Sequence, residues 1–189
     1  MAFAVSTFKS SLAKQSGGAR RALYQIDINH FSASSSLSTE QNILCKAASI
    51  PAANIAPLAV NYAGRAYKWN GFRTYDNWTV TVINDEDFAI RNSMTNWMRY
   101  MAGKMDGERT SLYGNPLVGK NWFDGAATVK QLSTSGGVKQ TCKFDYLWPT
   151  ELAGIPVDWS SDAIQEYTIT FAYDYWTHGT GSSATNVVN

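Results

Sequence analysis

Hydrophobic and polar residues alternate along several stretches of the chain, as in strands with one buried face. The first clear case is LYQIDINHF, from Leu23 to Phe31. Its apolar face carries Tyr24, Ile26 and Ile28. Its polar face carries Gln25, Asp27 and Asn29. A period of two predicts a half-buried strand here.

The longest alternation is AIQEYTITFAYDYW, residues 163–176. One face carries Tyr167, Ile169, Phe171, Tyr173 and Tyr175. The other face carries Thr168, Thr170, Ala172 and Asp174. The pattern predicts one long strand with a polar face.

Further strands are predicted between these two. One is NILCKAASI, which runs up to Pro51. Another is WTVTVI, which has a high content of β-branched residues. Two more, AATVKQL and VKQTCKFDYLW, are joined by STSGG, a hairpin signal. Residues 51–75 hold Pro57, Gly64 and Asn70-Gly71 between short β-like pieces, LAVNY and RAYKW. We expect an extended excursion with strand ends there.

One segment changes from period two to helical spacing across the polar cluster Asn84, Asp85, Glu86 and Asp87. Apolar residues then recur three and four apart at Ile90, Met94, Trp97, Met98 and Met101. A helix over about 86–102 is predicted, with Asn84 or Asp85 as its N-cap and carboxylates in its first turn. The acidic cluster is therefore interpreted as helix-start chemistry rather than a catalytic or metal site.

The remaining segments complete the expected organisation. Residues 1–18 are interpreted as an amphipathic arm ending in a hinge, residues 104–125 as a long loop, and residues 177–189 as a flexible polar tail. A single domain over 19–176 lies between arm and tail. The order of strands, one helix and more strands predicts a mainly β fold, an antiparallel β-sandwich or half-barrel with one flanking α-helix.

Composition narrows the functional classes. Charged residues are 16% of the 189 residues and the formal net charge is +1. Tight nucleic-acid binding requires clustered Lys and Arg, so it is not expected. The two cysteines, Cys45 and Cys142, have no metal-ligand spacing, and no apolar run is long enough to span a membrane. We expect a soluble protein that is made and kept inside a cell.

Candidate catalytic chemistry is sparse. The only histidines, His30 and His178, have no nucleophile in a recognisable pattern, so neither is expected to be catalytic. No metal site, cofactor or nucleotide-binding glycine pattern is predicted. One binding alternative stays open, because an aromatic-rich β-sandwich can stack sugars on exposed Trp and Tyr as a monomeric carbohydrate-binding module.

Four segments together resemble the tail tube protein family of contractile-tailed, T4-like bacteriophages. They are GGARRALYQIDI, CKAASIPAA, YDNWTVTVINDEDFAIRN and LWPTELAGIPVDWSSDAIQEYTITFAYDYW, in this order across most of the chain. The arm, the loop at 104–125 and the tail match poorly, so contacts made by those parts are not carried over.

The resemblance implies a structural virion protein without catalytic residues or cofactor. Its copies would form hexameric rings that stack into a hollow β-barrel tube, assembled in the host cytoplasm and placed in the tail. The implied partners are the sheath, baseplate, tail terminator and tape-measure proteins, with genome DNA in transit through the channel. The nearest alternative is the tube of a tailocin or a type VI-like secretion device.

Two expectations follow from a tube. The polar strand faces with Gln25, Asp27 and Asn29, or with Thr168, Thr170 and Asp174, are candidates for the channel lining. The excursion at 51–75 and the loop at 104–125 are candidates for ring-to-ring and tube-to-sheath contacts.

Overall fold

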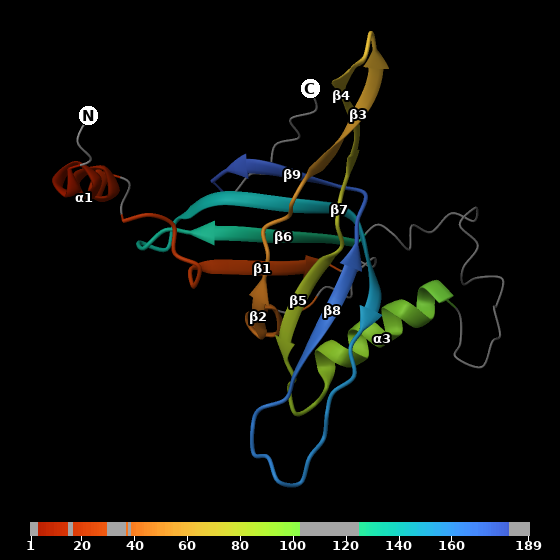
Figure 1. Ribbon diagram of the computed structural model, residues 1–189. Helices are drawn as coiled ribbons and strands as arrows, with labels where there is room; N and C mark the ends of the chain where they lie inside the picture. The colour runs from red at the N-terminus through yellow and green to blue at the C-terminus, as the bar shows by residue number, and fades with distance from the viewer. Residues whose placement is uncertain (1–3, 15–16, 30–36, 38, 103–124, 182–189) are drawn as a thin grey trace.

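The computed structural model describes residues 4–14, 17–29, 37, 39–102 and 125–181. Antiparallel strands dominate, which confirms the predicted mainly β fold (Figure 1). A seven-stranded sheet has the order β1-β6-β7-β8-β5-β2, with β9 also on β7, and β3 and β4 form a separate two-stranded sheet. The strands are β1 Tyr24–Asn29, β2 Cys45–Ala48, β3 Asn54–Tyr62, β4 Arg65–Thr74, β5 Trp78–Ile83, β6 Gly125–Leu132, β7 Val138–Leu152, β8 Glu166–Ala172 and β9 Tyr175–Thr180.

The long strand β7 belongs to two parts of the seven-stranded sheet. Its first part pairs with β6 and β9, and its end, from Trp148 to Leu152, pairs with β8. Between them Tyr146 has φ 57°, a left-handed conformation that turns the strand. We call β1, β6, β9 and the first part of β7 the first leaf, and β2, β5, β8 and the end of β7 the second leaf. The strands of the two leaves cross (Figure 1), as in sheets joined by a bent strand.

The core fills the space between the leaves. Trp78 of the second leaf stacks on Phe144 of the first, with ring centroids 4.4 Å apart. The alternating apolar residues of β1 and β8, such as Ile26 and Ile169, are buried on the same side. Burying aromatic side chains of this size supplies much of the hydrophobic stabilisation of a small domain.

The helix α3, Ala89–Ala102, closes one side of this core. Ile90, Met94 and Trp97 are fully buried, and the Trp97 ring lies 6.3 Å from that of Phe171. The apolar spacing thus predicted the buried face of the helix. Its beginning differs from the expectation of about 86, because residues 86–87 form a turn and Phe88 has φ 53° just before the helix.

Two segments differ from the expected secondary structure. Thr39–Ile43 form the short helix α2, where the start of a strand was expected. Residues 175–180 form β9, so the expected flexible tail from 177 is wrong for residues 177–180. β9 pairs with the edge of β7 that β6 does not use, and Cys142 there lies opposite His178. Residues 182–189 of the tail and the loop at 104–124 lie outside the described residues.

The predicted long strand at 163–176 is two strands. β8 ends at Ala172, and after Tyr173 and Asp174 the chain continues as β9 on the other leaf. Tyr175 is consequently 37% exposed instead of buried.

The amino-terminal helix α1, Val5–Lys14, stands apart from the body (Figure 1). It has no buried residue, and its apolar side chains Val5, Phe8 and Leu12 are all exposed. No described helix is long and apolar enough to cross a membrane.

Candidate assembly surfaces

The described residues hold no group of three His, Cys, Asp or Glu side chains placed to bind a metal ion. Burial raises the pKa of Cys45 to about 11, so its thiol stays protonated and is a poor nucleophile. His178 lies on β9, exposed, with its ring 5.7 Å from that of Trp176. His30 lies outside the described residues.

The acidic junction before α3 is used for local structure. Asp85 Oδ2 accepts a hydrogen bond of 2.9 Å from the backbone N–H of Ala89, the first residue of the helix. Asn84 Oδ1 accepts no hydrogen bond from the described residues, and its Nδ2 donates to Gln165 Oε1 at 3.0 Å. Glu86 and Asp87 are exposed and precede the helix. Asp85 therefore satisfies a free helix amide, as an N-cap does, from a position four residues upstream.

The first group of candidate channel residues lies on the outer face of the first leaf. Gln25 and Asp27 are half-buried and Asn29 is exposed, each alternating with buried Ile26 and Ile28. Asp27 pairs with Lys130 on β6 at 2.6 Å, and Gln25 Nε2 donates to Asp27 Oδ1 at 3.0 Å. On the same leaf Lys143 pairs with Asp145 at 2.6 Å. The charges of this face are largely neutralised in pairs.

The residues of the second group of candidate channel residues lie in two different places. Thr168 and Thr170 lie on the outer face of the second leaf, opposite Thr81 and Thr79 of β5 in the strand register. This places four hydroxyl side chains side by side. Glu151 of β7 lies opposite Thr170, and Glu166 at the start of β8 pairs with Lys46 at 2.6 Å. Asp174 is exposed in the bend between β8 and β9, away from this face. Because each leaf turns its other face to the shared core, the two groups do not form one continuous surface.

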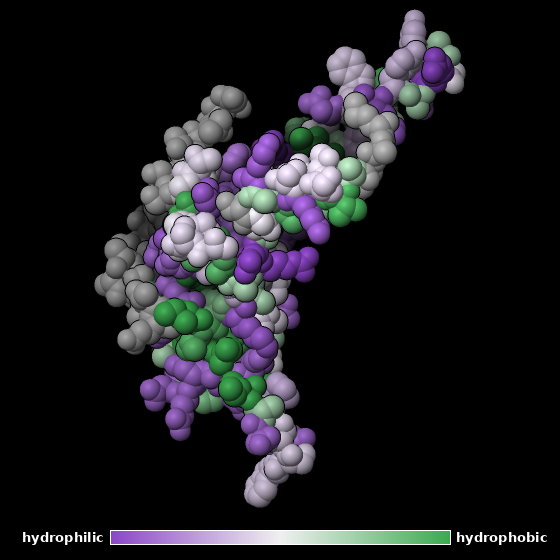
Figure 2. Space-filling view, turned by 90° about the vertical axis from the view of Figure 1, so that its left-hand side faces the viewer, coloured by the Kyte–Doolittle hydropathy of each residue, from purple (hydrophilic) through white to green (hydrophobic). Residues whose placement is uncertain are grey.

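The most exposed regular element is the hairpin of β3 and β4. It stands clear of the body in two views (Figures 1 and 2), and every residue of both strands except Gly71 is exposed. The register pairs Leu58 with Trp69 and Val60 with Tyr67. Since cross-strand partners point to the same side, these four side chains form one apolar face. Two-stranded hairpins are at best marginally stable alone, and an exposed apolar face of this kind is a candidate contact surface.

At the other end of the molecule the loop of residues 153–165 joins β7 to β8 (Figure 1). It exposes Val157 by 82%, Trp159 by 106% and Ile164 by 73%. Asp158 accepts hydrogen bonds from the backbone N–H and hydroxyl of Ser160, which lower the pKa of its carboxyl group. The loop thus combines apolar side chains with a carboxylate.

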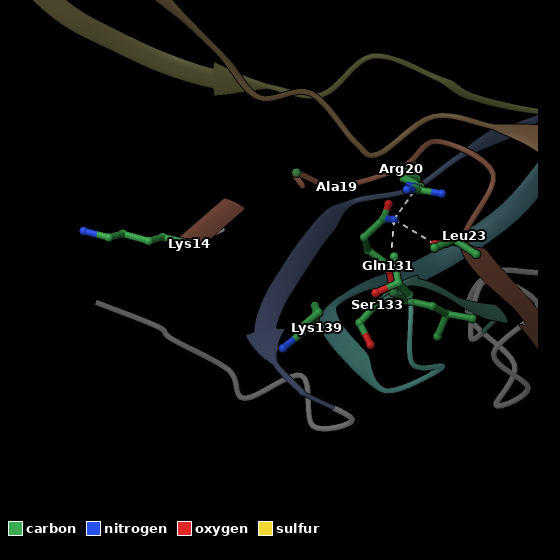
Figure 3. Close-up of a pocket in the computed structure, with 10 residues that line it drawn as sticks. Lys14, Ala19, Arg20, Leu23, Gln131, Ser133 and Lys139 are labelled. Carbon is green, nitrogen blue, oxygen red and sulfur yellow. Dashed lines mark hydrogen bonds between the residues drawn. The ribbon is translucent and has the colours of Figure 1, made fainter. Parts of the chain in front are cut away.

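A shallow pocket marks where the amino-terminal segment meets the sheet (Figure 3). Gln131 of β6 donates from Nε2 to the carbonyl oxygens of Arg20 and Leu23, at 2.9 and 2.7 Å. The charged residues of the lining, Lys14, Arg20 and Lys139, are all basic. The two hydrogen bonds of Gln131 hold the chain where it enters β1, and the described lining has no His, Asp or Glu that could act as a base for its Ser133 or Thr134 hydroxyl.

Sequence reasoning identified residues 51–75 as a contact candidate but not the apolar hairpin face. The available signal was Leu58, Val60, Tyr62 on one side of Ala63-Gly64 and Tyr67, Trp69 on the other. Ala63 and Gly64 both have positive φ, 47° and 77°, as in the two-residue turns that close hairpins.

Comparison with known proteins identifies a matching family and its members. The model of the family described as "Phage tail tube protein" matches residues 5–179. The chain is 31% identical over 163 residues to the tail tube protein gp19 of Enterobacteria phage T4, covering 84% of this chain and 90% of that one. It is 23% identical over 172 residues to the tail tube protein of Serratia phage KSP90, covering 89% and 93%.

Solved structures share the fold at low identity. One is a chain of the anti-feeding prophage baseplate, with a TM-score of 0.62 and 9% identity over 84% of this chain and 93% of that one. Another belongs to the sheath/tube terminator of the extracellular contractile injection system PVC, with a TM-score of 0.62 and 12% identity over 86% and 97%. The matched family model and the T4 relative together cover nearly all described elements, and the chain belongs to the phage tail tube protein family.

Proposed function

We propose that this chain is the subunit of the inner tube of a contractile phage tail, in which hexameric rings stack around an open channel. Genome DNA passes through this channel during ejection without a tight or sequence-specific grip, and the role is structural rather than catalytic. The observation that carries the proposal is the 31% identity to the T4 tail tube protein over 84% of this chain.

The sheet edges support closure into a ring. Within the described residues β2 pairs only with β5, and the end of β7 pairs only with β8. These are the two edges of the second leaf. Unpaired strand edges favour pairing with another chain, and closing a barrel removes them. Identical neighbours that join β2 of one copy to the end of β7 of the next would complete the leaf around the channel.

The outer face of the second leaf is the better candidate for the channel lining. Thr79, Thr81, Thr168 and Thr170 form a patch of hydroxyls on this face, beside the Lys46–Glu166 ion pair and Glu151. The first leaf presents the ion pairs Asp27–Lys130 and Lys143–Asp145 instead. A wall of hydroxyls whose described Lys46 is paired with Glu166 lets a polyanion slide, because phosphate affinity comes from unneutralised Lys and Arg. Gln25, Asp27 and Asn29 would then face away from the channel.

The proposed setting is a virion tail assembled in the host cytoplasm, with sheath, baseplate, terminator and tape-measure proteins as partners. A tailocin or type VI-like device remains the alternative of the same architecture. The phage relatives favour the virion, because the injection-system structures share only the fold at 9–12% identity.

The test combines microscopy with cysteine labelling of Thr168→Cys and Gln25→Cys. Negative-stain images of nucleated protein should show hollow tubes of stacked rings. A maleimide on a polymer too large to enter the channel should label Thr168→Cys in monomers but not along tubes, while Gln25→Cys reacts in both. The native Cys45 and Cys142, 4% and 1% exposed, set a low background.

Two results would count against the proposal at different levels. Protection of Gln25→Cys with free labelling of Thr168→Cys would assign the channel to the first leaf. Solid fibres or single monomers under nucleated conditions would contradict the tube itself.

A further inference from the structure

Two exposed surfaces lie at opposite ends of the molecule. The β3–β4 hairpin projects at one end, and the loop of residues 153–165 at the other (Figure 1). The hairpin continues the second leaf, since β2 runs into β3 and β4 runs into β5, while the loop joins the opposite ends of β7 and β8 of the same leaf. The two surfaces are thus the two rims of one sheet.

The surfaces complement each other in charge. The hairpin, residues 54–74, contains Arg65, Lys68 and Arg73 and no Asp or Glu. The loop, residues 153–165, contains Asp158 and Asp162 and no Lys or Arg. Opposite charges on two surfaces favour their encounter and set their orientation.

They also complement each other in apolar character. The hairpin exposes Trp69 by 65%, Leu58 by 59% and Tyr67 by 47%. The loop exposes Trp159 completely, with Val157 beside it in the chain. Large exposed aromatic residues are the side chains that dominate the centres of protein interfaces. The hairpin thus offers exposed apolar side chains with basic residues, and the loop offers exposed apolar side chains with acidic residues.

We propose that the β3–β4 hairpin of one copy docks on the 153–165 loop of a second copy, with Trp159 against the apolar hairpin face. The contact is heterologous, because it joins different surfaces of two identical chains. A heterologous contact between opposite ends propagates without limit and stacks ring on ring. The inference rests on the proposed tube function and names the residues of its axial contact.

Directed cross-linking tests the pairing. One population carries Arg65→Cys, which alternates onto the same hairpin face as Tyr67 and Trp69, and a second carries Asp162→Cys in the loop. Under mild oxidation the mixture should form a disulfide-linked dimer, and either population alone should not. Buried Cys45 and Cys142 serve as the internal control, since wild-type protein should form no dimer.

Charge exchange tests the energetics. Arg65→Glu, on the face of Tyr67 and Trp69, together with Arg73→Glu should raise the protein concentration needed for assembly at least tenfold, and so should Asp158→Lys with Asp162→Lys. The four substitutions together should restore assembly, because the complementarity returns with opposite sign. All four positions are exposed, so an unchanged melting temperature confirms that the body remains folded.

The outcomes separate the inference from the proposed function. Cross-links within the Arg65→Cys population alone would show a hairpin–hairpin contact and overturn the inference. Normal assembly of both charge variants would also overturn it while leaving the tube intact, and would point to another partner for the hairpin. Cross-linking in the mixture without any tubes would support the contact and contradict the tube function.

Discussion

At the scale of the residue, the junction of the two leaves and α3 depends on the absence of a side chain at Gly125. This residue begins β6, opposite Leu147 of β7 and beneath Trp97 of α3. A Cβ at this position would lie 2.3 Å from the Leu147 carbonyl oxygen and 2.4 Å from the Trp97 ring. The close approach holds the helix against the corner of the sheet.

We therefore expect Gly125→Ala to lower the free energy of unfolding by about 2–3 kcal/mol, because overpacking shifts both backbone and ring. Urea denaturation monitored by tryptophan fluorescence measures the change. Gly154→Ala is the matched control, since nothing lies within 4 Å of its Cβ position. It should change stability by less than about 0.5 kcal/mol. Equal effects of the two substitutions would contradict this account of the corner.

At the scale of the element, local pattern predicted those strands and the helix whose partners lie on one face. The alternation around Ile26 and Ile169 and the spacing of Ile90, Met94 and Trp97 are local consequences of one buried side. The division of residues 163–176 into β8 and β9 is not local, because the alternation continues through Tyr173 while the chain changes leaf.

Pairing with distant strands also explains the other differences between the predicted and the observed elements. β9 consists of Thr, His and Gly after Tyr175 and Trp176, residues with no clear apolar face, and it is a strand because β7 supplies the partner edge. Tyr146 turns β7 without a Gly or Pro to mark the corner. Of the candidate surfaces, the polar faces were predictable from alternation. Their assignment to different leaves required the pairing of strands far apart in the sequence.

The hairpin is the element whose stability should depend most on assembly. Replacing residues 59–68 by an Asn-Gly turn between Leu58 and Trp69 removes most of it at paired positions. The free energy of unfolding of the body should change by less than about 0.5 kcal/mol, because the removed side chains are exposed and lie outside the core cluster. Tube formation should be lost.

Hydrogen exchange checks the same idea in the intact protein. Hairpin amides should exchange rapidly in monomers and become protected in tubes, while β5 and β8 amides are protected in both. Protection of the hairpin in monomers, or tubes formed by the shortened variant, would contradict its dependence on a neighbour.

At the scale of the whole molecule, the formal net charge is only +1, but basic and acidic residues lie at opposite ends of the subunit. The basic hairpin and the acidic loop stand at opposite ends, whereas the ion pairs Asp27–Lys130 and Lys143–Asp145 neutralise the first leaf between them. Copies that approach head to tail attract, and copies that approach with like ends repel. Charge distribution, rather than net charge, thus gives the subunit a direction.

This direction predicts how assembly responds to salt. Exposed charges are screened over about 10 Å at 0.1 M and about 3 Å at 1 M ionic strength, so added NaCl should slow the growth of nucleated tubes. A variant with Arg65→Gln, Arg73→Gln, Asp158→Asn and Asp162→Asn keeps the aromatic contact of Trp159 and should grow slowly at every NaCl concentration. Light scattering during nucleated growth measures both rates. If wild-type protein and the variant responded equally to NaCl, the axial charges would have no part in stacking, and the apolar faces alone would have to orient one ring on the next.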